Sequence, residues 1–284
     1  MSVAARVGFM QGRLSDPVDG RIQAFPWESW QQEFAAGAAH GFHMMEWTLD
    51  QERLYENPLL TSGGQAEIRA LCGRHDFAIP SLTGDCFMQA PLWKAHGTQR
   101  TALERDFDAI AAACAAVGIS TIVVPLVDNG RLATEEQERV LLSFLESRIS
   151  GLAAQGLCIA FECDFAPEDL ARFIARLPAA QFGINYDIGN SAALGFDPVA
   201  ELSAYGSRIV NVHVKDRMLG GTTVPLGAGN ARFDAVFGLL SAGGYQGNYI
   251  LQTARASDGH HAQALRRYRD MTIDWVTHAA RARR

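Results

Sequence analysis

The chain has 284 residues, of which 48% are hydrophobic and 20% are charged, a composition that can bury a large core. Its formal net charge of −6 excludes the basic surface that binding to a nucleic-acid backbone requires. The five cysteines form no CxxC pair, which argues against a disulfide framework or a structural zinc site, and the N-terminus lacks the apolar segment of a secretory signal. We therefore expect a cytoplasmic protein with no nucleic-acid partner.

Short apolar strands alternate with helical segments along the whole chain. The predicted strands cover residues 6–10, 44–47, 78–82, 121–124, 157–162, 182–187, 209–214 and 249–252. The predicted helices cover residues 27–40, 65–75, 99–117, 135–155, 167–177, 198–205, 233–242 and 260–280. This alternation implies parallel strands with right-handed crossovers, and eight such units close a barrel. We expect a single (β/α)8 TIM barrel over residues 1–284.

Two other architectures are weighed against the barrel. An open doubly wound sheet is disfavoured because the first predicted strand is followed by Gln11-Gly12-Arg13-Leu14-Ser15, which is not GxGxxG. The uncharged residues 109–127 are long enough to cross a bilayer. Gly118 and Pro125 divide that stretch into a helix and a short strand, so we expect no membrane partner.

Polar side chains lie at the ends of four consecutive predicted strands: Glu162, Asp187, His213 and Gln252. The carboxyl ends of the strands form the active-site face of a TIM barrel, so these side chains should converge. Any one of them alone would be explained by a helix cap, an ion pair or a hydrogen-bonded core histidine. Together, the oxygen and imidazole donors suit Mn²⁺, Zn²⁺, Co²⁺ or Mg²⁺, and the sequence predicts one divalent metal ion.

The same motifs carry a family resemblance. The segments Phe161-Glu162-Cys163-Asp164, Tyr186-Asp187-Ile188-Gly189-Asn190, Val212-His213-Val214-Lys215-Asp216 and Gly227-Ala228-Gly229 resemble the xylose-isomerase-like TIM-barrel superfamily, in particular its sugar-phosphate isomerases and epimerases. The resemblance covers essentially the whole chain, although only the motifs of the last four strands are specific. It implies that Glu162, Asp187 and His213 bind one divalent metal ion and that Arg217 holds substrate hydroxyls or phosphate.

The chain departs from the family pattern at two positions. Gln252 stands where members usually have glutamate, and Asn190 stands where many have histidine. An amide oxygen can ligate a metal, but an amide cannot take a proton. Epimerisation needs a base on each face of the enediolate, whereas aldose–ketose isomerisation can run with one. Gln252 therefore favours one-base chemistry through Glu162, unless Lys215, Glu46 or Asp85 supplies a second base.

Substrate binding is predicted from polar groups that follow the strands. We expect Glu162 and Lys215 to be catalytic, and the substrate to contact Arg13, Glu46, Asn190, Arg217 and Arg255. Two long loops, 14–26 and 218–231, are of the length that is typical of functional loops. Gly227 and Gly229 in the second loop either bind phosphate together with Arg217 and Arg255, or only shape a turn while the arginines pair with acids.

The sequence thus predicts a divalent-metal-dependent isomerase or epimerase of a small sugar or sugar phosphate. Its reaction would be proton transfer next to a carbonyl through a metal-stabilised enediolate. An inosose-type dehydratase or lyase, which starts with the same proton abstraction, and a non-catalytic sugar-binding barrel are the alternatives. The sequence names neither the sugar nor the metal, and it leaves the oligomeric state open, a homo-oligomer included.

Overall fold

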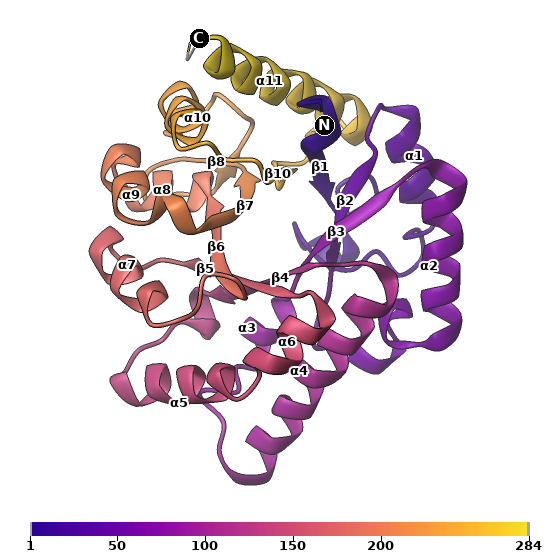
Figure 1. Cartoon of the computed structure of the whole chain (residues 1–284). Coiled ribbons are helices and arrows are strands. Elements are labelled where there is room, and N and C mark those ends of the chain that lie inside the picture. Colours follow the sequence, from indigo (N-terminus) through magenta and orange to yellow (C-terminus); the bar gives the residue numbers. More distant parts are fainter. Residues whose placement is uncertain (1, 283–284) are drawn as a thin grey trace.

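Eight parallel strands close into a barrel in the order β1-β10-β7-β6-β5-β4-β3-β2 (Figure 1), in a computed structural model that describes residues 2–282. The barrel strands are β1 Val7–Met10, β2 Met44–Thr48, β3 Ala78–Thr83, β4 Thr121–Leu126, β5 Cys158–Cys163, β6 Phe182–Asp187, β7 Ile209–Val214 and β10 Asn248–Leu251. The predicted TIM barrel is confirmed, and every predicted strand is present within two residues of its expected ends. The eighth strand of the barrel carries the label β10 because two short strands precede it.

Helices surround the barrel in Figure 1. They are α1 Gln32–Ala39, α2 Ser62–His75, α3 Asp85–Gln89, α4 Gly97–Val117, α5 Glu135–Glu146, α6 Ile149–Gln155, α7 Pro167–Ala175, α8 Ile188–Leu194, α9 Pro198–Tyr205, α10 Phe233–Ala242 and α11 His261–Ala282. The predicted helix 135–155 is broken between α5 and α6. The short helices α3 and α8 were not predicted, because each begins within two residues of a strand and has no amphipathic repeat of its own.

The barrel strands are buried on both faces, as parallel strands covered by helices must be. Outward-facing aromatics such as Phe161 and Phe182, whose rings stack with centroids 6.3 Å apart, pack in the layer between strands and helices. Met10, Met44 and Ile250 form a separate small apolar cluster. The apolar interior thus provides a rigid base for the polar side chains at the strand ends.

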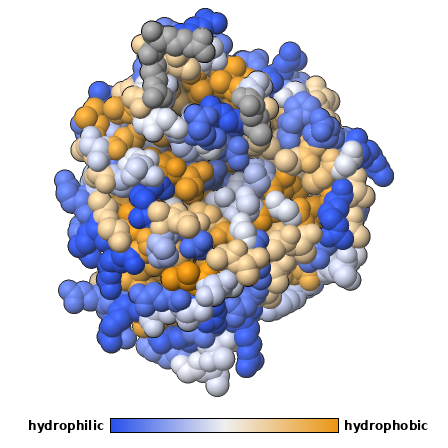
Figure 2. Space-filling model, in the orientation of Figure 1, coloured by the Kyte–Doolittle hydropathy of each residue, from blue (hydrophilic) through white to orange (hydrophobic). Residues whose placement is uncertain are grey.

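Two loops extend the barrel at its carboxyl ends. One covers residues 14–26 after β1, and the other contains the antiparallel pair β8 Asp216–Arg217 and β9 Thr223–Val224 after β7. The face shown in Figure 2 intersperses apolar groups among polar ones. Within residues 2–282, no helix is long and apolar enough to span a membrane, and residues 109–127 are divided between α4 and β4.

Candidate active site and metal centre

Three of the predicted metal ligands converge at the ends of adjacent strands. Glu162 lies near the end of β5, Asp187 ends β6 and His213 lies near the end of β7. One ligand atom of each lies within 4.8 Å of the other two, and all three residues are buried. The strand register sets this geometry, because it pairs Asp187 directly with His213. Two carboxylates and an imidazole are a donor set that fits a divalent metal ion.

The histidine ring is held by a carboxylate on each side. Its Nε2 lies 2.7 Å from Glu46 Oε1, and its Nδ1 lies 3.1 Å from Glu162 Oε2. Burial would lower the pKa of His213, but the Glu46 and Glu162 carboxylates raise it to about 10. Glu46 accepts further hydrogen bonds from Ser81 Oγ at 2.6 Å and Asn211 Nδ2 at 2.9 Å. A carboxylate that holds the second ring nitrogen is the usual partner of a metal-binding histidine, so Glu46 fits an orienting role.

Glu162 is fixed by two asparagines. Asn185 Nδ2 donates to its Oε2 at 2.9 Å, and Asn190 Nδ2 donates to its Oε1 at 2.8 Å. Asn185 precedes Asp187 by two residues on β6, so both side chains point into the barrel. The Glu162 carboxylate is therefore held in one orientation by two amide N–H donors, and the residue is 7% exposed.

Lys215, directly after β7, links the carboxylates to the predicted fourth ligand. Its Nζ donates to Asp187 Oδ2 at 3.2 Å, Asn190 Oδ1 at 3.1 Å and Gln252 Oε1 at 3.0 Å. The three hydrogens of the ammonium group are thereby used. Gln252 joins the site through Lys215, and its role as a metal ligand stays a prediction.

A cavity of about 500 Å³ opens above these groups at the carboxyl ends of the strands. Its lining includes five of the predicted site residues: Glu162, Asn190, Lys215, Arg217 and Gln252. Arg13, Glu46 and Arg255 are not in its lining. The structure therefore places five predicted site residues in the lining and clusters Asp187 and His213 with Glu162 beside it, while Arg13, Glu46 and Arg255 do not line the cavity.

Glu46, Arg13 and Arg255 have partners within the protein in place of the expected substrate contacts. The Glu46 side chain has no exposed surface. Arg13 donates to Thr253 O, Ile22 O and Gln23 Oε1, and burial together with the nearby Arg255 lowers the pKa of Arg13 to about 9. Arg255 donates to the carbonyl oxygens of Gly12, Ser15 and Ile22. Both arginines hold the 14–26 loop against β10, and their substrate contact stays a prediction.

The glycine-rich loop after β7 binds a carboxylate of its own chain. Asp216 Oδ2 accepts hydrogen bonds from the amides of Gly227 at 2.8 Å and Gly229 at 2.9 Å, and its Oδ1 accepts one from Ala231 at 3.0 Å. A Cβ at position 229 would lie 2.2 Å from Asp216 Oδ1, so this approach requires glycine. Arg217 donates to Gly221 O and, at 2.8 Å, to Asn190 Oδ1. The loop amides are therefore occupied without an external anion.

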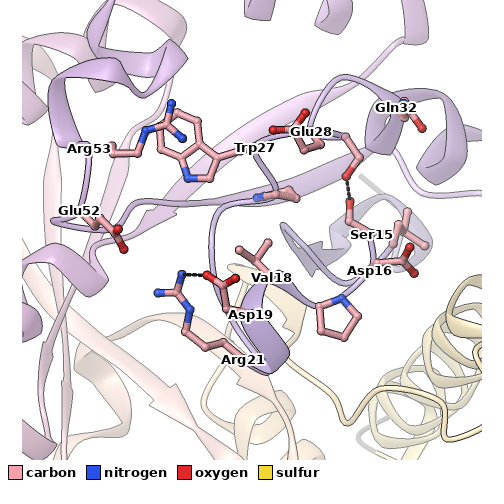
Figure 3. A pocket seen from close by; sticks show the side chains of 14 residues that line it. Ser15, Asp16, Val18, Asp19, Arg21, Trp27, Glu28, Gln32, Glu52 and Arg53 are labelled. Atoms are coloured by element: carbon pink, nitrogen blue, oxygen red, sulfur yellow. Dashed lines mark hydrogen bonds and ion pairs between the residues drawn. The ribbon is translucent and has the colours of Figure 1, made fainter.

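A second hollow, of about 610 Å³, is lined largely by residues of the 14–26 loop and the segment that follows it (Figure 3). Arg53 covers the ring of Trp27 there, with its guanidinium carbon 3.9 Å from the ring centroid. Ser29 Oγ donates to Ser15 Oγ across the same hollow at 2.8 Å. None of the predicted site residues lines it, so its larger volume does not make it the active site.

Several residues of the site were missed by the sequence analysis. Asn185 and Asn211 each precede a predicted ligand by two residues, and this period-two spacing on a strand was the available signal. Gln23 had no such signal. It lies in the 14–26 loop and lines the cavity, where it accepts a hydrogen bond from Gln252, 229 positions away in the sequence.

Residues 34–272 match the family described as xylose isomerase-like TIM barrel. The chain belongs to this family. No curated protein sequence matches the chain.

Solved structures of similar fold include several members that act on sugars. A 3-keto-D-glucoside 4-epimerase, YcjR, from E. coli is 20% identical with a TM-score of 0.68, covering 96% of this chain and 98% of that one. D-psicose 3-epimerase with D-tagatose from Clostridium cellulolyticum H10 is 12% identical with a TM-score of 0.71, covering 97% and 99%. The IOLI protein with a bound zinc atom is 16% identical with a TM-score of 0.72, covering 96% and 99%. At these identities the likeness establishes the fold.

Proposed function

We propose that this protein is a divalent-metal-dependent isomerase or epimerase of a small sugar, acting by proton transfer next to a carbonyl. The observation that carries the proposal is the convergence of Glu162, Asp187 and His213 beside the cavity. The epimerases and the zinc-containing protein of the same fold support it. The metal ion, held by these three residues, would supply Lewis-acid stabilisation of negative charge on substrate oxygens.

The residues around the cavity have distinct roles in this proposal. Glu162 takes the proton from the carbon next to the carbonyl, because it is the one predicted ligand whose carboxylate also lines the cavity. Lys215 and Asn190 hold substrate hydroxyls, since both line the cavity and a hydroxyl can replace the hydrogen bond that joins Lys215 to Asn190. Arg217, which lines the same cavity beside Asn190, holds a further hydroxyl.

We further propose that the substrate is an unphosphorylated sugar. The amides of Gly227, Gly229 and Ala231, which would bind a phosphate, instead hold Asp216. The charged residues in the cavity lining are four acids and two bases: Asp85, Asp128, Glu162, Asp164, Lys215 and Arg217. An excess of carboxylates repels a phosphate dianion, whereas sugar hydroxyls can donate to carboxylates.

The test of the proposed function has two parts. Purified protein should carry about one divalent ion per chain, and Asp187→Ala and His213→Ala should each lose it, because loss of a direct ligand weakens binding more than the tenfold to hundredfold of an outer residue. His278→Ala, at an exposed position of α11, is the matched control that should keep the metal. Stoichiometric metal in both ligand variants would contradict the assignment.

The second part measures chemistry in deuterated water. A panel of free ketoses that includes D-tagatose, D-psicose and L-ribulose is incubated with the metal-loaded protein and followed by NMR. Deuterium at the carbon next to the carbonyl, together with an isomer or epimer, is the expected result. Loss of water from the substrate would instead indicate the dehydratase alternative, and bound metal without exchange on any sugar would indicate a non-catalytic barrel.

A further inference from the structure

The site lacks the second carboxylate that a two-base reaction needs at the end of β10, where Gln252 stands. Two of the three substitutes considered from the sequence are ill placed. Glu46 has no exposed side-chain surface and is bonded to His213, Ser81 and Asn211. Lys215 uses the three hydrogens of its ammonium group on Asp187, Asn190 and Gln252.

Asp85 is the remaining substitute, and it lines the same cavity as Glu162. It is the first residue of α3, directly beyond the end of β3, and it is 9% exposed. The two other acids of the lining are differently placed. Asp164 forms an ion pair with Arg131 at 3.3 Å, and Asp128 is exposed. Asp85 is thus the buried carboxylate that reaches the cavity from the β3 side, while Glu162 reaches it from β5.

A chain of hydrogen bonds with fixed polarity leads from Lys215 to Asp85. Because an ammonium group only donates, Gln252 must present Oε1 to Lys215 and its Nε2 to Gln23 Oε1, at 2.9 Å. Gln23 must then present its Nε2 to Asp85, and this Nε2 donates to Asp85 Oδ2 at 2.7 Å. Arg13 also donates to Gln23 Oε1, at 3.3 Å, which strengthens the same orientation. Asp85 Oδ2 is therefore committed as an acceptor, and Oδ1 is the oxygen left to carry a proton.

The surroundings of Asp85 allow it to hold that proton near neutral pH. Burial raises the pKa of Asp85, and the Asp50 and Glu162 carboxylates add to the rise. The hydrogen bond from Gln23 and the nearby Arg13 oppose it, and together these effects bring the pKa of Asp85 to about 7. Asp50 is itself held by Phe25 N at 2.9 Å and Gln89 Nε2 at 2.7 Å, so it stays in place as a neighbouring charge. A group with a pKa near the working pH is suited to proton transfer in both directions.

We propose that Asp85 is the second proton-transfer residue of this site and that the reaction is an epimerisation; this rests on the function proposed above. Glu162 takes the proton from the carbon next to the carbonyl, and the electrons of that C–H bond move into the enediolate. Asp85, as a carboxylic acid, gives its proton to the same carbon from the β3 side, and the carbonyl forms again. Glu162 then carries a proton and Asp85 a charge, and exchange with water restores both.

The experiment uses the metal-loaded full chain, the ketose panel above and Asp85→Asn. An asparagine oxygen can still accept from Gln23, but the amide cannot carry the proton. We expect epimer formation to fall roughly 10²- to 10⁴-fold, which is the usual effect of losing an acid–base group. Deuterium should still enter the starting sugar with its configuration retained, because Glu162 remains. Asp76→Asn is the matched control, since Asp76 is exposed near the opposite end of β3 in a left-handed conformation that asparagine tolerates.

The outcomes separate the two proposals. Epimerisation by Asp85→Asn at the wild-type rate would overturn the role of Asp85 alone. Loss of exchange together with epimerisation, with metal content and folding intact, would also overturn it, because Asp85 would then be needed for the first step. Wild-type protein that exchanges no proton on any sugar would overturn the proposed function and, with it, the role of Asp85.

Two further variants keep the proposal falsifiable if Asp85→Asn does not fold. Gln23→Ala removes the half-buried amide that donates to Asp85, and it should lower epimerisation more than exchange. Gln252→Glu places a carboxylate where family members usually have one, so in the Asp85→Asn background it should restore epimer formation. A double variant that exchanges protons but forms no epimer would show that the missing group is not a second acid–base residue.

Discussion

The imidazole Nε2 of His213 lies 2.7 Å from Oε1 of Glu46, and both side chains are fully buried. This contact turns Nδ1 of the ring toward Glu162, whose Oε2 lies 3.1 Å from it. Glu46 pairs in register with Ser81 on β3 and with Met10 on β1, so it is fixed by the barrel itself. The candidate metal site therefore depends on a carboxylate that neither lines the cavity nor belongs to the three clustered ligand candidates.

Glu46→Gln should weaken metal binding about ten- to a hundredfold, because carboxylates that hold a ligand histidine contribute that much. Titration of the metal-free protein with Zn²⁺ or Mn²⁺, followed by calorimetry, measures the change. Ser81→Ala removes one of the other partners of Glu46 and should have a smaller effect. If metal affinity is unchanged and the KM for sugar rises, the result would support the substrate-binding role of Glu46 that was expected from the sequence.

Discrimination against phosphate is the second prediction. The kcat/KM for an active ketose should exceed that for its phosphate ester by at least about tenfold. The phosphate group would be desolvated in the cavity without a charged partner, and this free-energy cost exceeds the contribution of one hydrogen bond. Arg217→Ala should raise the KM of both substrates alike, because Arg217 bonds to Asn190 and Gly221 and lies among the cavity carboxylates. A KM increase confined to the phosphorylated sugar would show that Arg217 binds phosphate.

The pKa of Asp85, raised to about 7, predicts a pH-dependent stability. The folded state holds the proton more tightly than the unfolded chain, so the free energy of unfolding falls as the pH rises from about 4 to about 7. Asp85→Asn removes this penalty, and the variant should gain up to about 4 kcal/mol at pH 8 and almost nothing below pH 4. Denaturant unfolding at both pH values tests this. A gain that does not change with pH would mean that Asp85 is not desolvated.

Arg13 should stabilise the 14–26 loop rather than bind substrate. Arg13→Ala should lower the free energy of unfolding by roughly 1.5–3 kcal/mol, the usual contribution of charged hydrogen bonds, and should also raise KM because Gln23 loses a partner. Arg21→Ala is the control, since this exposed arginine of the same loop forms an ion pair with the exposed Asp19. Unchanged stability with a large rise in KM would instead support the direct substrate contact first expected.

The barrel and its group of candidate metal ligands were accessible from the sequence. Strand positions follow from short buried apolar runs, and the carboxyl ends of parallel strands must meet at one face. Glu162, Asp187 and His213 each stand at or near such an end, so their convergence required no knowledge of distances. The short helices α3 and α8 were missed because a helix of five or seven residues carries too little periodicity to detect.

The partners of the remaining polar groups were decided by tertiary structure alone. Arg13 and Arg255 were expected to contact substrate, yet they donate to carbonyl oxygens up to 243 residues away. The glycines at 227 and 229 have the pattern of a phosphate loop, but the carboxylate that fills it belongs to Asp216. Local pattern reports periodicity and burial, whereas a hydrogen bond depends on which distant atoms the closed barrel brings within about 3 Å. For the same reason no sequence pattern predicts the series of hydrogen bonds that runs from Lys215 through Gln252 and Gln23 to Asp85. These residues follow β7, β10, β1 and β3, which are far apart in the sequence.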